Sequence, residues 1–402
     1  MSKVTNIRGI PVFGDPIDNA VDQMEQCIMP SANYVALMAD HHLGYSMAIG
    51  GVAAYDDMIS PSCVGYDIGC GNKAVRVNAG AHGVRERISE IMDTIFDELE
   101  FGIGTKNYHG SLEPVHLFNQ HPEGVNVLRD IEKIKPPRAG TMFNLANDQF
   151  GTLGGGNHYV DIMTDEQDRV WIGVHCGSRG LGHTIASWFL GLAGVTDNPM
   201  AEPALFHVDS WEGIQYINAM RLAGDYAMAN RNWIVQHVVD LMGWKEEETV
   251  HNHHNYAWEE NHFGKDMWVI RKGATPAFPG QRGFIGGSMG DNAVIVEGVE
   301  SEDSAVAMYS TVHGAGRAMS RGDARGKIKN GVVKKEAKVT SKMMTDWLKD
   351  FGVEVRGGDV DEAPQAYKRL DEVLAAQSDT IKVLHTLKPI GVAMAPPMKR
   401  KW

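Results

Sequence analysis

Asp67 and Cys70 lie three residues apart in the segment GYDIGCGNK, where glycine flanks the thiol on both sides. Three histidines in other polar, mostly glycine-rich segments, His158, His175 and His254, complete a set of one carboxylate, one thiol and three imidazoles. Such donors suit borderline divalent cations, and a thiolate can bridge two of them. Ligand softness favours zinc, whereas the carboxylate and open positions also admit manganese. A nucleophilic thiol is the chief alternative role for Cys70.

Two further glycine-rich segments carry residues that suit phosphate. HGAGR places His313 before Gly314, Gly316 and Arg317, and CGSRG places Arg179 in a second turn. Glycines let backbone N–H groups approach an anion, and a guanidinium pairs with phosphate oxygens. A neutral imidazole can attack phosphorus, although a histidine that only caps a glycine turn is the alternative for His313. No Walker A motif and no Rossmann fingerprint in its proper setting occurs, so a nucleotide must be held in another way.

The elements that must position these residues are short strands and amphipathic helices. Apolar and β-branched runs predict strands at residues 75–77, 159–163, 170–174, 268–270 and 293–296. Helical periodicity predicts helices with breaks at residues 84–100, 211–243 and 364–385, the second ending at Gly243. Because no linker, repeat or composition shift divides the chain, we expect one large α+β domain over residues 1–402.

Composition limits the classes of protein that fit this chain of 402 residues. It is 43% hydrophobic and 22% charged, which is typical of a globular protein. The absence of an apolar run of roughly 20 residues and of a signal peptide predicts a soluble cytoplasmic protein without a membrane partner. With only four cysteines a disulfide framework is not expected, and Cys27 and Cys63 are typical of buried small hydrophobes.

The net charge of −13 argues against non-specific binding to nucleic acid. One basic stretch stands apart, opposed only by Asp323 and Glu336. A solvated charged face is the usual explanation of such a run, and a local groove for nucleic acid is the alternative. Its basic residues are Arg317, Arg321, Arg325, Lys327, Lys329, Lys334, Lys335, Lys338 and Lys342.

The ordered motifs DIGCG, GTLGGGNH, HCGSRGLGH, HHNY, RKGA, GSMG and HGAGRAMSR closely resemble those of the RtcB-type RNA ligases. The resemblance runs from about residue 30 to about residue 392. It implies a fold of mixed β-sheets around a metal-containing cleft with flanking helices. It also implies GTP-dependent joining of an RNA 3′-phosphate or 2′,3′-cyclic phosphate to a 5′-hydroxyl, in tRNA splicing or RNA repair. A histidine–GMP adduct and Mn²⁺ take part in that reaction.

The resemblance assigns roles to the residues at matching positions. Cys70 would bridge two Mn²⁺ ions, and His313 would be the guanylylated nucleophile. Asp40, in MADHH, matches an acidic residue needed for activity. The remaining metal ligands would be Asp67 and His158 at one ion and His175 and His254 at the other. Positions near phosphates are Asn157, Arg179, Arg317 and Arg321, and those that resemble guanosine contacts are Ser288 and Tyr367.

The chain departs from the family pattern at the expected guanine site. Met394 and Ala395 occupy the places of a C-terminal Lys-Gly pair whose lysine contacts guanine, and Asp161 stands where many relatives have glutamate. Lys399, Arg400 or Lys401 are the candidates to replace that lysine.

Two alternatives to the ligase stay open. One is a divergent paralogue that guanylylates or caps other RNA or DNA 3′-phosphate ends, and the other is a non-catalytic RNA-end-binding metal protein. Retention of His313 with the whole ligand set favours an enzyme. An activating protein partner is left open, and we expect a monomer or weak dimer.

Overall fold

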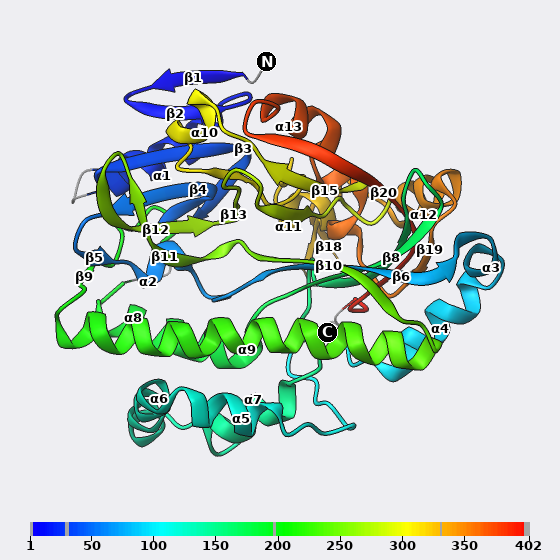
Figure 1. Cartoon of the computed structure of the whole chain (residues 1–402), viewed down its shortest axis with the longest axis horizontal. Helices are drawn as coiled ribbons and strands as arrows, with labels where there is room; N and C mark the ends of the chain where they lie inside the picture. The colour runs from blue at the N-terminus through cyan, green and yellow to red at the C-terminus, as the bar shows by residue number, and fades with distance from the viewer. Residues whose placement is uncertain (1–2, 29–31, 196–197, 330–331, 398–402) are drawn as a thin grey trace.

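The computed structural model describes residues 3–28, 32–195, 198–329 and 332–397. A long helix, α9 (Trp211–Met242), separates the sheets from a layer of short helices (Figure 1). Ser210 caps its N-terminus by accepting from the Gly213 N–H, and Gly243 ends it with a left-handed φ of 65°. The helix predicted over residues 211–243 is confirmed and runs without a break. The layer beyond it consists of α5 (Glu113–Gln120), α6 (Pro122–Ile134) and α7 (Met142–Gln149).

An eight-stranded sheet lies on the other side of α9. Neighbouring strands are antiparallel except for β19 (Glu354–Arg356), which runs parallel to β20 (Ile381–Met394). The strands predicted at residues 75–77, 159–163, 170–174 and 293–296 are confirmed within it. In spatial order its strands are β10 (Glu246–His253), β6 (Gly71–Gly80), β8 (Arg169–Cys176), β7 (Tyr159–Thr164), β20 (Ile381–Met394), β15 (Ala293–Gly298) and β14 (Arg282–Ile285), with β19 (Glu354–Arg356) beside β20.

A six-stranded mixed sheet forms the other half of the framework. Only β2 and β3 are parallel in it, and the strand predicted at residues 268–270 is confirmed within β12. Its order is β1 (Val4–Ile7), β2 (Ile10–Phe13), β3 (Tyr34–Tyr45), β4 (Met47–Tyr55), β12 (Lys265–Lys272) and β11 (Asn255–His262). Two-stranded pairs join β13 (Ala274–Pro276) to β16 (Ser310–Val312), β17 (Lys327–Lys329) to β18 (Val332–Lys335) and β5 (Met58–Ile59) to β9 (Phe206–His207).

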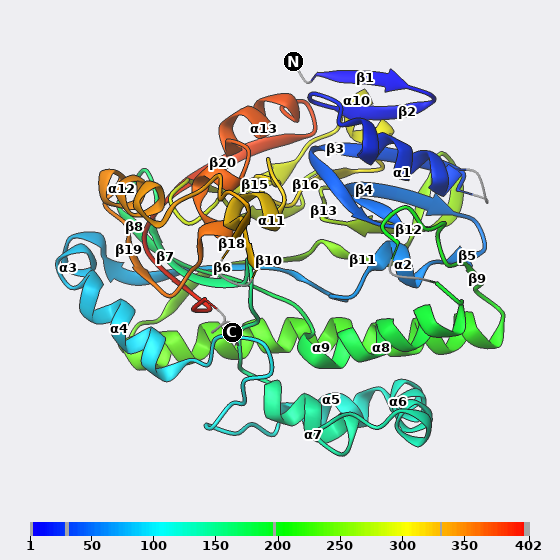
Figure 2. The same cartoon turned by 180° about the vertical axis from the view of Figure 1, so that it is seen from behind.

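The remaining helices flank the sheets, so the fold is α+β (Figure 2). They are α1 (Asp18–Ile28), α2 (Pro61–Val64), α3 (Ala81–Glu86), α4 (Ile88–Glu98), α8 (Arg179–Leu192), α10 (Glu302–Val306), α11 (Arg321–Arg325), α12 (Ser341–Phe351) and α13 (Leu370–Ala376), with 3₁₀ turns at Val360–Glu362 and Pro364–Ala366. The helix predicted over residues 84–100 is α3 followed by α4, with the break at Arg87. Among the described residues, no helix combines the length and apolar character that crossing a membrane requires.

The helix predicted over residues 364–385 is wrong in its second half. Only residues 370–376 form an α-helix there, and β20 begins at Ile381. Val383 pairs with Val296 and His385 with Ile295 of β15. Pairing with a strand nearly 90 residues away in sequence outweighs a local helical period, because tertiary context routinely overrides weak propensity.

The antiparallel order of four strands brings the predicted metal ligands to one edge of the eight-stranded sheet. Cys70 immediately precedes β6, His158 precedes β7, His175 is the penultimate residue of β8, and His254 follows β10. Gly71 pairs with both His253 and Cys176, so the start of β6 adjoins the ends of β10 and β8. Strand topology therefore gathers donors that lie far apart in the sequence.

Candidate active site

A cavity of about 340 Å³ opens at this sheet edge, and His42 of β3 and Ile49 of β4 also line it. Most of the residues singled out from the sequence line it. They are Asp67, Cys70, Asn157, His158, Asp161, His175, His254, Ser288, His313, Gly314, Gly316, Arg317, Arg321, Tyr367 and Met394.

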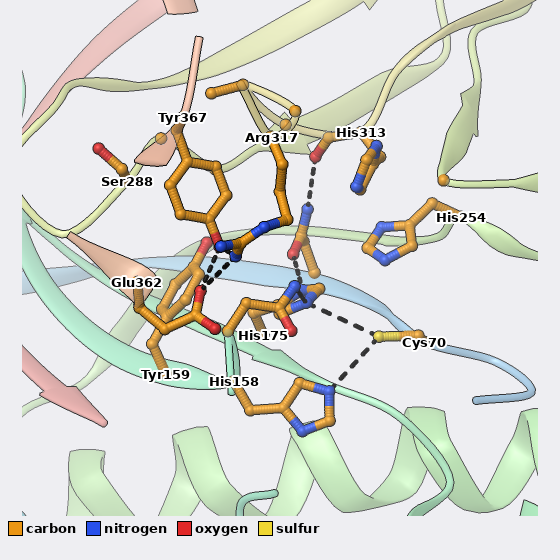
Figure 3. A pocket seen from close by; sticks show the side chains of 18 of the residues that line it. Cys70, His158, Tyr159, His175, His254, Ser288, His313, Arg317, Glu362 and Tyr367 are labelled. Atoms are coloured by element: carbon orange, nitrogen blue, oxygen red, sulfur yellow. Dashed lines mark hydrogen bonds and ion pairs between the residues drawn. The ribbon is translucent and has the colours of Figure 1, made fainter. Parts of the chain in front are cut away.

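The predicted metal ligands converge at the floor of this cavity (Figure 3). Cys70 Sγ lies 3.7 Å from both His158 Nε2 and His175 Nε2, and Asp67 Oδ2 lies 3.1 Å from His158 Nε2. The rings of His175 and His254 stack with centroids 5.1 Å apart. One carboxylate, one thiol and three imidazoles thus face a common space.

The protonation of these groups suits a cation. Burial holds the pKa of His175 and of His254 well below the usual value, so both imidazoles are neutral donors at neutral pH. Burial acts to raise the pKa of Asp67, but the hydrogen bond and charge of His158 outweigh it and lower that pKa to about 2. The site therefore presents an ionised carboxylate beside neutral imidazoles, which is the form that metal ions require.

Unpartnered atoms provide a further test of whether a metal fits. His158 Nδ1 and His254 Nδ1 are buried and have no hydrogen-bond partner in the part of the chain that the structure describes. Burial, and secondarily the charge of Asp67, raises the pKa of the Cys70 thiol well above its usual value. A thiol in that state is a poor free nucleophile, whereas a bound cation would remove its proton. The donors thus fit a metal site better than the alternative of a lone nucleophilic Cys70.

His313 lies on the opposite wall, directly after β16, and its ring centroid is 4.9 Å from that of His254. Its Nδ1 atom lies 2.6 Å from Oδ2 of Asp40 on β3, in a close electrostatic contact that departs from hydrogen-bond geometry. The same Oδ2 accepts from the backbone N–H groups of His313 at 3.0 Å and Gly314 at 3.3 Å. Burial acts to raise the pKa of Asp40, but the charge and hydrogen bonds of His313 lower it overall. Asp40 is therefore a carboxylate that orients the imidazole.

Arginines and an aromatic ring form a third wall. The Arg317 guanidinium lies 4.9 Å from the centroid of the Tyr367 ring and donates to the Tyr367 hydroxyl at 3.0 Å. Arg317 and Arg321 both contact the buried Glu362, and Arg321 also pairs with Asp361 at 2.8 Å. These acidic partners hold the guanidinium groups in place at the rim of the cavity.

Two of the residues to which the resemblance assigns a role, Asp40 and Arg179, do not line the cavity. Asp40 lies behind His313. The main-chain carbonyl oxygen of Asp40 would be 2.1 Å from a Cβ at position 316, so the close approach of the two backbones requires Gly316. Arg179 is buried beside the cavity, donating to Thr152 Oγ1 at 3.1 Å and to the Gly102 carbonyl at 2.8 Å. Lys399, Arg400 and Lys401, the candidates for the missing lysine, lie outside the described residues.

Sequence reasoning missed residues that position the site. Asn72 Oδ1 lies 2.6 Å from His175 Nδ1, which directs the other nitrogen, Nε2, toward Cys70. Asn72, on β6, follows Cys70 by two residues. Side chains two residues apart in an extended chain point to the same side, and this spacing was the signal that could have revealed Asn72. The fully buried Arg231 of α9 donates to the carbonyls of Gly69 and Cys176 and so ties two strand ends together. No local motif marks Glu362 or Arg231.

Comparison with known proteins agrees with this geometry. The family model described as tRNA-splicing ligase RtcB matches residues 23–395. The RNA-splicing ligase RtcB of Escherichia coli K12 is 34% identical over 95% of both chains. The tRNA-splicing ligase RtcB of Thermococcus kodakarensis is 32% identical over 90% of this chain and 87% of its own. That of Archaeoglobus fulgidus is 31% identical over 93% and 91%, respectively. The chain therefore belongs to the RtcB family.

Proposed function

We propose that this protein is a GTP-dependent RNA ligase that joins RNA 3′-phosphate or 2′,3′-cyclic phosphate ends to 5′-hydroxyl ends in the cytoplasm, for tRNA splicing or RNA repair. The observation that carries the proposal is the position of His313. Its ring faces the metal-ligand cluster through His254, while Asp40 holds its far nitrogen. A binding protein would have no need of a nucleophile oriented in this way.

In the proposed first step, His313 Nε2 attacks the α-phosphorus of GTP. The N–P bond forms, the bond to the β-phosphate oxygen breaks, and pyrophosphate leaves. Asp40 keeps the proton on Nδ1 and stabilises the positive charge that the ring gains, as the buried aspartate does in a catalytic triad.

In the next steps, an oxygen of the RNA 3′-phosphate displaces His313 from the GMP phosphorus. The 5′-hydroxyl then attacks the activated 3′-phosphate and GMP leaves, while a cyclic phosphate must first be opened by water. Arg317 and Arg321 line the cavity and would pair with the phosphates. Two Mn²⁺ ions held by Asp67, Cys70, His158, His175 and His254 would neutralise phosphate charge and align the leaving groups.

Nucleotide choice is expected to depend on Asp161, a buried carboxyl whose Oδ1 has no partner. Burial raises the pKa of this carboxyl well above its usual value. A guanine edge offers two N–H donors, which adenine does not, and would stabilise the ionised form of the carboxyl. We expect Asp161→Asn to lower the rate of adduct formation with GTP by about tenfold to a hundredfold, the usual effect of leaving a buried donor without its acceptor. The measurement is the ratio of GTP to ATP labelling.

Asp161→Glu is the matched control, since it keeps the carboxylate and should retain the preference for GTP. An unchanged ratio of GTP to ATP labelling in Asp161→Asn would show that guanine is read elsewhere.

The exposed hairpin of β17 and β18 is proposed as part of the RNA path. Lys334 and Lys335 are both exposed on β18, and among the described residues only Lys335 has an acidic partner, Asp323. Replacing both lysines with alanine should weaken RNA binding at low salt and reduce the slope of log affinity against log salt by about two.

Lys133→Ala, on α6 at the far side of α9, is the control and should change neither quantity. If the double variant keeps the native affinity and salt slope, the RNA follows another surface.

A joining assay tests the proposal directly. RNA halves with a 3′-phosphate and a 5′-hydroxyl are incubated with GTP and Mn²⁺, in parallel with the corresponding DNA ends. Joined RNA is the expected product. Accumulation of a 3′-capped end without joining would favour the divergent paralogue, and binding without any covalent product would favour the non-catalytic alternative.

A further inference from the structure

A second cluster of metal-binding side chains lies outside the catalytic cavity. Glu98 is the last residue of α4, His109 lies in the segment between α4 and α5, and His237 is on α9. One nitrogen from each histidine and one carboxylate oxygen of Glu98 lie within 4.8 Å of one another. None of these residues lines the catalytic cavity.

The cluster contains an unpartnered group. His237 Nε2 is buried and has no hydrogen-bond partner among the described residues, while its ring stacks on Trp233 with centroids 4.7 Å apart and a 12° interplanar angle. The ring of His109 lies 4.5 Å from that of His237, and its Nε2 atom is 3.0 Å from the Glu98 main-chain carbonyl oxygen and 3.5 Å from Glu98 Oε2. A cation bound among these groups would compete with that hydrogen bond. It would also give the orphaned nitrogen of His237 the partner that a buried polar atom in a native fold calls for.

A second group of similar composition, Asp165 with Glu166 and His385, is less suited to a cation. Asp165 already accepts from Arg169 at 2.6 Å and from Trp171 at 2.9 Å. These donors satisfy the Asp165 carboxylate within the protein, whereas among the described residues the Glu98 carboxylate faces the two histidines of its own cluster.

We propose that Glu98, His109 and His237 bind a zinc ion, with water in the fourth position. Two imidazoles and one carboxylate are an established ligand set for zinc in tetrahedral sites. The three ligands come from α4, from the connecting segment and from α9. A cation there fastens residues 99–112 to the long helix.

That segment adjoins the catalytic cavity. The Gly102 N–H donates to the Leu153 carbonyl at 2.9 Å, and the Gly102 carbonyl accepts from Arg179 at 2.8 Å. Leu153 begins the turn that leads to Asn157 and His158. Zinc at the second cluster therefore steadies the turn that carries one of the catalytic-site ligands.

The test is zinc stoichiometry of the full chain after chelator treatment, with Zn²⁺ alone as the probe. His109→Gln combined with His237→Gln should bind about one ion fewer per chain than the native protein. His82→Gln, an exposed histidine on α3 that contacts Glu86, is the control and should bind the native number. The same difference of one ion should appear in a Cys70→Ala background, which separates this site from the catalytic cavity.

Hydrogen exchange provides the structural readout, because Zn²⁺ should slow exchange over residues 99–112 in the native chain and not in the double variant. Equal zinc content in the native chain and the double variant would overturn the proposal. If the double variant does not fold, Glu98→Gln replaces it, with an expected rise of at least about tenfold in the zinc dissociation constant. An unchanged constant in that variant would overturn the proposal equally.

Discussion

Replacing Cys70 with alanine is expected to weaken metal binding by more than about a hundredfold and to reduce adduct formation with GTP to background. The loss of a single supporting group around a metal already costs about tenfold to a hundredfold, and Cys70 faces two of the imidazoles directly. Calorimetric titration of the metal-free protein with Mn²⁺, together with labelled-GTP incorporation, measures both effects.

Cys27→Ala is the control for this prediction, since Cys27 is equally buried but lies on α1. It should bind Mn²⁺ as the native chain does. Native metal affinity in Cys70→Ala would show that the thiol is not a ligand and would favour the alternative of a nucleophilic thiol.

Asp40→Asn is expected to slow adduct formation by about 10³- to 10⁴-fold, as when the aspartate of a catalytic triad is replaced by its amide. The amide keeps the shape of the side chain but removes the charge that stabilises the His313 ring. It also presents either an N–H or a carbonyl to Nδ1, so the ring can adopt the wrong tautomer. The rate is measured by single-turnover labelling with GTP.

Metal affinity distinguishes this effect from misfolding, because Asp40 lies behind His313 and outside the metal-ligand cluster. The variant should retain native Mn²⁺ binding, and Asp15→Asn, an exposed aspartate paired with Lys3, should retain native rates. A loss of less than tenfold in Asp40→Asn would mean that His313 needs no orienting carboxylate.

The residues of the cavity were largely predictable, because each donor lies beside a glycine-rich turn or a strand end. Which of those turns lie together in space was not predictable. Asp40 and His313 are 273 residues apart and meet only because β3 of one sheet passes the end of β16. Arg179 resembled a phosphate ligand, yet its side chain is directed toward Gly102, a contact that no local pattern encodes.

The wrong prediction of a helix over residues 364–385 also arises from a contact between segments far apart in the sequence. The apolar spacing of that segment fits a helix, but β15 offers an unpaired edge that residues 381–387 complete. Sheet completion satisfies many backbone groups at once, which local periodicity cannot anticipate. The same strand continues to Met394, so the divergent end of the chain forms part of the cavity wall.

The central claim is that His313 becomes covalently guanylylated. The most direct test is incubation with α-labelled GTP and Mn²⁺, followed by a denaturing gel and mapping of the adduct, for the native chain and for His313→Ala. The account predicts a label on His313 in the native chain and none in the variant. A label that persists in His313→Ala, or a native chain that takes no label from any nucleotide, would contradict it.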